Sequence, residues 1–241
     1  MLPITAPPPW LTRIGVFDLE TTGVDVEYDR IVTAHVGVID ADGHEFAWRD
    51  WLADPGIEIP AGATAVHGIT TARARSAGRP AHEVVGEVTS ALRSLLSQNV
   101  PVVAYNASYD FSLLAHEAAR HGIAPLADPW PVIDPLVIDK AYDRYRPGKR
   151  TLSVVAAHYE VGLDGAHDAA ADAVAAGRVA LALARRYRLP VSPGELHTNQ
   201  IGWARAQAAS LTEYFIGIGR LDPDERIDGT WPVRTAKPAS S

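Results

Sequence analysis

The pattern of apolar and polar positions predicts strands at the start of the chain and alternating helices and strands after them. Apolar runs of strand length are shared by five segments: 14–17, 31–39, 44–51, 100–105 and 130–134. Apolar residues at helical spacing are shared by five others: 82–97, 110–121, 152–159, 168–187 and 195–219. The Asp42-Gly43 pair is a strong turn signal, so the strands on either side are expected to run antiparallel. This order predicts a mixed α/β sheet.

Prolines and glycines mark the expected boundaries of domains. Residues 1–12 form a Pro-rich lead-in that is expected to contain no helix, and 190–194 interrupt the chain with two prolines and a glycine. These breaks predict one domain over 13–188 and a C-terminal helical extension over 189–241. The last residues, 235–241, have the composition of a loose tail.

Composition excludes several classes of protein. The 241 residues are 47% hydrophobic and 21% charged, which is ordinary for a globular chain and excludes a wholly disordered or fibrous one. The absence of Cys excludes disulfides, thiolate zinc sites, iron–sulfur clusters and cysteine nucleophiles. No apolar run approaches the roughly 18 residues that a membrane span needs, and the N-terminus lacks a signal-peptide pattern. We therefore expect a cytoplasmic protein with no membrane contact.

The net charge of −7 argues mildly against a nucleic-acid-binding function, because proteins that bind nucleic acids are usually basic. Bound divalent ions would offset part of this charge. The segment 142–150 is locally basic and could contact backbone phosphates, or it could be a solvated loop.

Two acidic residues end the first strand. Asp18 and Glu20 are two positions apart, so both side chains point to the same side of a strand. Two carboxylates held side by side are costly unless a cation joins them. The alternative is a strand that simply ends in acidic residues beside a turn.

Polar residues also stand at the starts of two predicted helices. Asn106 and Asp110 are i, i+4 neighbours, so Asn106 could cap the helix while Asp110 points back over the end of the strand. His167 is expected on the loop before the last long helix of the main domain, with Asp172 inside its first turns. Acidic residues are also common at helix N-termini for electrostatic reasons, which could explain Asp168 and Asp172.

Taken in order, these motifs resemble those of DnaQ-like 3′–5′ exonucleases of the DEDD superfamily, in the histidine-bearing DEDDh branch. The Asp-x-Glu-Thr-Thr-Gly motif matches Asp18 to Gly23, Asn-x-x-x-Asp matches Asn106 and Asp110, and His-x-x-x-x-Asp matches His167 and Asp172. A fourth element, Thr-x-x-His-Gly-Ile, matches 64–69. The tyrosine branch would have Tyr where Asp168 stands. The resemblance covers about residues 13–188.

The resemblance implies a fold and a site. The fold would be ribonuclease H-like, a mixed five-stranded sheet flanked by helices. Two Mg²⁺ or Mn²⁺ ions would be held by four carboxylates, those of Asp18, Glu20, Asp110 and Asp172, and His167 would act as the general base. The pocket for the terminal nucleotide would comprise Leu19, Thr21, Thr22, His67, Asn106 and Tyr109. Tyr109 could stack on a base or pack in the core, and Leu19 could wedge beside the base or fill the core.

The resemblance also implies a function. We expect a metal-dependent exonuclease that releases nucleoside 5′-monophosphates from single-stranded or frayed 3′ ends, with DNA favoured. The alternatives are an RNA-directed exoribonuclease and a non-catalytic replisome-binding module. The C-terminal helix 195–219 carries an apolar stripe at helical spacing, Leu211, Tyr214, Phe215 and Ile218. It could pack on the domain itself, or it could dock a DNA polymerase or a second copy of the chain.

Overall fold

The computed structural model describes residues 8–163, 165, 167–190 and 192–234. Most of the Pro-rich lead-in and the expected loose tail 235–241 lie outside these residues. The described chain forms a six-stranded sheet with the order β4-β3-β2-β1-β5-β6. Its strands are β1 (Ile14–Thr21), β2 (Ile31–Ile39), β3 (Glu45–Asp54), β4 (Arg79–Pro80), β5 (Val102–Val103) and β6 (Val132–Ile133).

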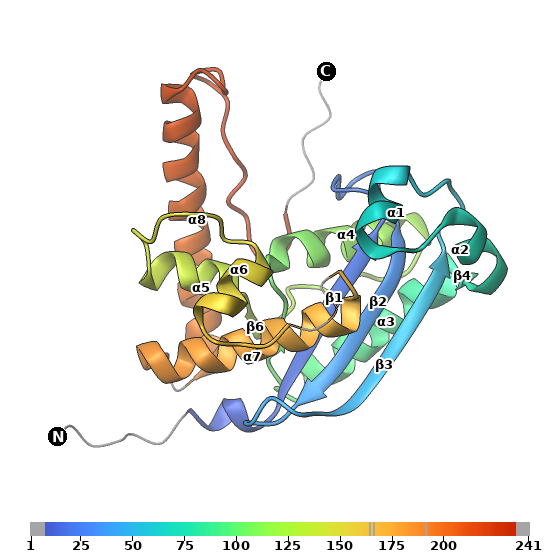
Figure 1. Cartoon of the computed structure of the whole chain (residues 1–241), viewed down its shortest axis with the longest axis horizontal. Helices are drawn as coiled ribbons and strands as arrows, with labels where there is room; N and C mark the ends of the chain where they lie inside the picture. Colours follow the sequence, from blue (N-terminus) through green and yellow to red (C-terminus); the bar gives the residue numbers. More distant parts are fainter. Residues whose placement is uncertain (1–7, 164, 166, 191, 235–241) are drawn as a thin grey trace.

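Three long antiparallel strands make up most of the sheet (Figure 1). β1 pairs with β2 from Ile14 opposite Ile39, and β2 pairs with β3 across the expected hairpin turn, where Gly43 has a φ of +82°. The other three strands have two residues each and run parallel to their neighbours. The predicted α/β class and the ribonuclease H-like arrangement are confirmed, with six strands in place of five because β4 extends the edge beside β3.

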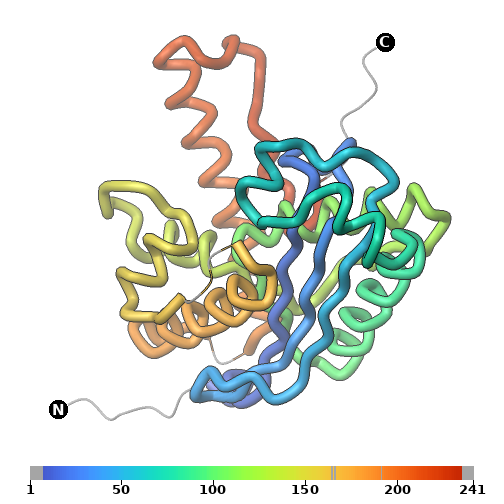
Figure 2. The backbone as a smooth tube through the Cα atoms, turned by 45° about the vertical axis from the view of Figure 1, so that its right-hand side comes forward, coloured from blue at the N-terminus to red at the C-terminus, as the bar shows by residue number. Residues whose placement is uncertain are grey.

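Helices cover both faces of the sheet. They are α1 (Ala61–His67), α2 (Thr71–Ala77), α3 (Ala81–Ser97), α4 (Ala107–Arg120), α5 (Pro135–Tyr142), α6 (Leu152–His158), α7 (Ala169–Tyr187) and α8 (Pro193–Gly217). Figure 2 shows α7 on one side of the long strands and α3 on the other. Two buried apolar clusters fill the two interfaces, one including Phe17, Leu92 and Phe111, the other including Val16, Ile39 and Val179.

The close contact between α7 and β1 positions the ends of both elements. Gly177 of α7 lies against Val16 and Ile39, and a Cβ atom there would come within 2.6 Å of both side chains. The small residues of α7 therefore allow the helix to approach the sheet closely. This packing brings the first turn of α7 to the carboxyl end of β1.

Several expectations about local structure were wrong. A short 3₁₀ helix, Pro9–Thr12, lies in the lead-in, where no helix was expected, because Trp10 and Leu11 are buried against the domain. α1, α2 and α5 were not predicted. The first strand reaches Thr21, four residues beyond the predicted apolar run 14–17, so Asp18 and Glu20 both lie within the strand. The remaining long helices begin and end within three residues of the predicted bounds.

The C-terminal helix α8 extends beyond the sheet, and residues 218–234 return along it toward α4 (Figure 1). Its first half packs on the domain, where Leu196, His197 and Gln200 are buried. In its outer half Thr212 is buried, whereas Tyr214 is 60% exposed and Ile218, directly after the helix, is 47% exposed. The expected packing on the domain is therefore seen mainly in the first half. Among the described residues, no helix is long and apolar enough to cross a membrane.

Candidate active site

Four carboxylates from three elements converge at the carboxyl end of β1. Asp18 and Glu20 lie on one face of this strand, as their spacing predicted, and Asp172 reaches them from the first turn of α7. Asp110 comes from the first turn of α4, where its Oδ1 accepts a hydrogen bond from the Leu19 backbone N at 3.2 Å. The structure thus brings together four acids that are up to 154 positions apart in the chain.

The electrostatics of this cluster are unfavourable for ionised carboxylates. Burial raises the pKa of Asp18 well above its ordinary value, and the charges of Asp110, Glu20 and Asp172 raise it further. Burial together with Asp172 and Asp168 raises the pKa of Glu20 from 4.5 to about 7. Such mutual repulsion is relieved when a cation lies among the carboxylates.

The donor set fits a divalent cation. Oδ1 of Asp172 is buried and has no hydrogen-bond partner among the described residues. Ligand atoms of Glu20, His167 and Asp172 all lie within 4.8 Å of one another. Carboxylate oxygens are the ligands that Mg²⁺ and Mn²⁺ prefer. An unpaired buried oxygen among four acids is therefore well matched to such an ion.

A second cluster of possible metal ligands lacks both the raised pKa values and the unpaired buried oxygen. Asp40, Asp42 and His44 also place three ligand atoms close together, but they lie on the hairpin turn between β2 and β3. Backbone amides of His44 and Asp42 donate to Asp40 and help to lower its pKa. Its carboxylate already has partners, so this turn carries no signal for a metal.

His167 lies on the loop before α7, as expected, and its side chain is exposed. Its backbone has a φ of +68°, and its backbone N donates to Asp172 Oδ2 at 3.3 Å. Asp168 accepts from the backbone N of Ala170 at 3.0 Å and caps α7, which accounts for this residue without a role in the site. His167 and Asp172 are thereby held next to each other.

The start of α4 differs from the sequence prediction. Asn106 stands at the N-cap position with a φ of +63°, but its side chain makes no capping hydrogen bond. The cap comes instead from Asp134, whose carboxylate accepts from the backbone N of Asn106 at 3.0 Å and of Ala107 at 2.9 Å. The same carboxylate also accepts from Leu136 N at 2.9 Å and from Trp231 Nε1 at 3.3 Å.

Asp134 is a positioning residue that sequence reasoning missed. It is buried, and burial raises its pKa although backbone amides donate to it. Its own backbone N donates to Gln200 Oε1 at 2.6 Å, which ties it to α8. The Asp134-Pro135 pair is a recognisable start signal for α5, but the contact with α4 spans 28 positions and leaves no local pattern.

Two of the residues expected around a terminal nucleotide, Thr21 and Tyr109, are hydrogen-bonded to each other and to Gly23. The Tyr109 hydroxyl donates to Gly23 O at 2.6 Å and also contacts Thr21 Oγ1. Thr22 Oγ1 donates to Asp29 Oδ1 at 2.7 Å. The ring of Tyr109 packs against the core, so its position is fixed from both ends.

Leu19 and His67 complete this group. Leu19 is buried in the same core cluster as Phe17, in agreement with the core-filling alternative. His67 Nδ1 accepts from Ile69 N at 3.1 Å, and the buried Nε2 makes no hydrogen bond of regular geometry with the described residues, although the ring lies beside the backbone of Thr21. Burial lowers the pKa of His67, which favours the neutral ring.

The fold and the carboxylate cluster define the class of ribonuclease H-like nucleases. The sequence model of the exonuclease family (RNase_T) matches residues 16–180, and the chain belongs to this family. The expected membership of the DEDDh branch is confirmed.

Relatives and solved structures agree with this membership. The chain is 30% identical over 170 residues to the PolC-type DNA polymerase III of Streptococcus sanguinis. The aligned region covers 68% of the chain and 10% of the relative. It is 27% identical over 189 residues to the PolC-type enzyme of Lactococcus lactis, which covers 78% of the chain and again 10% of the relative. The chain therefore spans about a tenth of these relatives.

The fold is similar to that of E. coli exonuclease I in complex with a dA16 oligonucleotide. The TM-score is 0.65 at 19% identity, over 80% of this chain and 44% of the other. At this identity the likeness concerns the fold. Together with the family match, it supports a nuclease function for the chain.

Proposed function

We propose that the chain is a metal-dependent 3′–5′ exonuclease that hydrolyses the terminal phosphodiester and releases nucleoside 5′-monophosphates. The observation that carries the proposal is the convergence of Asp18, Glu20, Asp110 and Asp172, with an unpaired buried oxygen on Asp172, beside the exposed His167. Nothing else among the described residues gathers as many partly buried acids with raised pKa values.

The four carboxylates would hold two Mg²⁺ or Mn²⁺ ions, and Asp18 lies close enough to the three other acids for their charges to raise its pKa. Such ions neutralise the phosphodiester and stabilise the leaving oxygen. Their positive charge would also offset much of the net charge of −7 and so favour a polyanionic substrate.

His167 would take the proton from the attacking water. Its side chain is exposed on a loop, and its backbone is tied to Asp172, so the ring stays beside the carboxylates and remains open to solvent. Histidine is the side chain that most often serves as a general base.

The group around Tyr109 would hold the terminal nucleotide. Tyr109 supplies aromatic surface, and Leu19 belongs to the core cluster on which Tyr109 packs. Thr21 and Thr22 stand directly after Glu20, and His67 lies beside the backbone of Thr21. Asn106 has a free side chain at the start of α4.

DNA is the favoured substrate. The curated relatives are named as DNA polymerases, and the similar structures of E. coli exonuclease I hold DNA oligonucleotides. These observations support a place in replication or repair. Frayed or single-stranded 3′ ends would suit a site at the carboxyl end of the central strand β1.

The direct test is digestion of DNA and RNA strands of one sequence, each labelled at the 5′ end, with Mn²⁺ and with the metal removed by EDTA. The proposal expects a descending ladder of labelled DNA products with Mn²⁺ and none with EDTA. Immediate release of the 5′ label as a mononucleotide would show digestion from the 5′ end and contradict the proposed 3′–5′ direction. Faster loss of RNA than of DNA would make the chain an exoribonuclease instead.

A further inference from the structure

A groove runs from the start of α4 outward between α5 and α8. Its inner part is lined by Asn106 and Ser108 on one side and by Lys140 and Gln207 on the other. Its outer part is a hollow of about 600 Å³, and it shares Lys140, Gln207 and Leu211 with the inner part. The two parts are therefore continuous. The inner end lies at the first turn of α4, the turn that carries Asp110.

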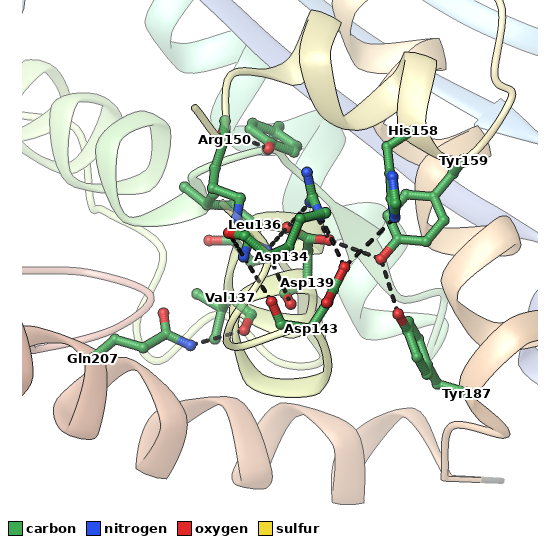
Figure 3. Close-up of polar contacts among 12 residues, drawn as sticks. Asp134, Leu136, Val137, Asp139, Asp143, Arg150, His158, Tyr159, Tyr187 and Gln207 are labelled. Carbon is green, nitrogen blue, oxygen red and sulfur yellow. Dashed lines mark hydrogen bonds and ion pairs between the residues drawn. The ribbon is translucent and has the colours of Figure 1, made fainter. Parts of the chain in front are cut away.

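The helices that form the groove are fixed to each other. Gln207 of α8 donates to Val137 O of α5 at 2.9 Å, and both residues are labelled in Figure 3. At the inner end, Arg234 donates to Ser108 Oγ at 3.2 Å, which adds a cation beside α4. The groove is thus a built feature of the domain and its C-terminal extension.

The basic segment 142–150 divides into an inward and an outward part. Arg146 and Arg150 both bind the buried carboxylate of Asp139, and Tyr159 donates to it at 2.8 Å (Figure 3). Burial would raise the pKa of Asp139, but these donors hold it below its ordinary value. The two arginines therefore anchor the loop, and their charges are already paired with carboxylates. Arg144 lies outside this cluster and lines the groove.

The outer half of the groove is positively charged. Lys140 and Arg144 line it and no acidic side chain does. Lys140 is half-buried, and no hydrogen bond or ion pair joins its ammonium to the described residues. Burial lowers its pKa, and the charges of Asp134 and Asp139 act against this shift. The inner half also contains two acids, the exposed Asp228, which accepts from Thr230 N at 2.8 Å, and the buried Asp134 with its four donors. The free phosphates of a bound strand would therefore lie in the outer half.

Aromatic side chains accompany these cations. Trp203 forms part of the wall of the groove. Its ring meets that of Tyr142 edge to face, with 5.5 Å between the ring centroids. Tyr214 lies at the same outer hollow and is 60% exposed. Arg144 itself lies over the ring of Tyr145, 5.7 Å from its centroid. A groove with cations beside aromatic rings is an arrangement that binds single-stranded nucleic acid without sequence preference.

We propose that the groove between α5 and α8 holds the nucleotides that precede the scissile 3′ end, with their phosphates at Lys140 and Arg144 and a base stacked on Tyr214. The inference rests on the proposed function for the direction of the strand. Charge complementarity and continuity with the start of α4 favour a nucleic-acid strand over an apolar peptide. The C-terminal extension then has a role in substrate binding.

The test compares a double variant, Lys140→Gln with Arg144→Gln, and a second variant, Tyr214→Ala, with wild type. Arg205→Gln is the matched control, because Arg205 is an exposed cation of α8 that does not line the groove. Binding of a fluorescent dT12 strand is measured by anisotropy in EDTA at several salt concentrations. Cleavage of dT12 and of a dT2 dinucleotide is measured with Mn²⁺.

The double variant should weaken dT12 binding about tenfold, and the slope of log affinity against log salt should fall by about 1.4, or about 0.7 for each cation removed. Tyr214→Ala should weaken binding about fivefold or more. The value of kcat/KM should fall about tenfold for dT12 and less than twofold for dT2, because a dinucleotide is too short to fill the groove. Arg205→Gln should behave as wild type.

The two proposals fail in different ways. Wild-type protein that binds dT12 through Lys140 and Arg144 but never shortens it would remove the exonuclease proposal and keep the groove. Cleavage with equal rates for wild type and all groove variants, on both lengths, would remove the groove and keep the exonuclease. A concentration-dependent dimer that the groove variants abolish, with DNA binding unchanged, would make this surface a protein interface and overturn the inference.

Discussion

Asp134→Asn replaces the carboxylate that holds the first turn of α4 with an amide of nearly the same shape. In the native protein Oδ1 accepts from Asn106 N and Leu136 N, and Oδ2 accepts from Ala107 N and Trp231 Nε1. An amide can keep one pair of these bonds. Its NH₂ group would then face two N–H donors in a buried site.

The cost follows from these two lost contacts. Leaving a buried donor without a partner costs about 1–3 kcal/mol, and the variant no longer pays to bury the charge of Asp134, whose pKa burial has raised. We expect a net loss of about 2–4 kcal/mol in the free energy of unfolding, which a domain with roughly 5–15 kcal/mol survives. Because the turn also carries Asp110, the cleavage rate should fall about 10- to 100-fold.

Urea unfolding and cleavage of a labelled strand measure the two effects. Asp224→Asn is the control, because this exposed acid makes no described hydrogen bond or ion pair, and it should change stability by less than about 0.5 kcal/mol. If Asp134→Asn also changes stability by less than about 0.5 kcal/mol, the carboxylate does not hold α4 as described.

Three further predictions concern the carboxylate site. The pKa of Glu20 is about 7 instead of 4.5, so its ionisation costs the folded protein stability as the pH rises through this interval. Glu20→Gln should therefore make the metal-free protein about 1–2 kcal/mol more stable at pH 8, after allowance for solvent screening, and no more stable at pH 4. Urea unfolding that shows no gain at pH 8 would contradict this. The same proton must leave before a metal binds, so Mn²⁺ affinity measured by calorimetry should be about tenfold weaker at pH 6 than at pH 8, whereas pH-independent binding would refute the assignment. His167→Ala should lower turnover roughly 10²–10⁴-fold with little change in Mn²⁺ affinity; a large loss of affinity would make His167 a ligand instead of a base.

The long elements were predictable because their burial pattern is local. α3 and α7 bury regular apolar faces, and β2 is an apolar run between turn signals, so periodicity alone located them. α1 has seven residues and buries none of them, so it leaves no apolar pattern. α5 does carry a start signal in Asp134-Pro135, which the spacing of apolar residues does not reveal.

The sequence predicted the relative positions of site residues when both residues belong to the same helix or strand. The shared side of Asp18 and Glu20 follows from the period of a strand. The cap of α4 was assigned to Asn106 on local grounds, yet the backbone there is left-handed and the cap is Asp134, a partner chosen by tertiary packing. The sequence likewise did not predict that the side chains of Arg146 and Arg150 point inward, because their orientation depends on ion pairs with the buried Asp139.

The most direct test of the account compares wild type with Asp18→Asn on a 5′-labelled DNA strand in Mn²⁺. Asp18 is the acid whose charge is coupled to all three others, and the change removes one ligand without adding bulk. We predict that wild type shortens the strand from its 3′ end and releases nucleoside 5′-monophosphates, while the folded variant leaves it intact. A variant that cleaves at near the wild-type rate, or wild-type cleavage that persists in EDTA, would contradict the account.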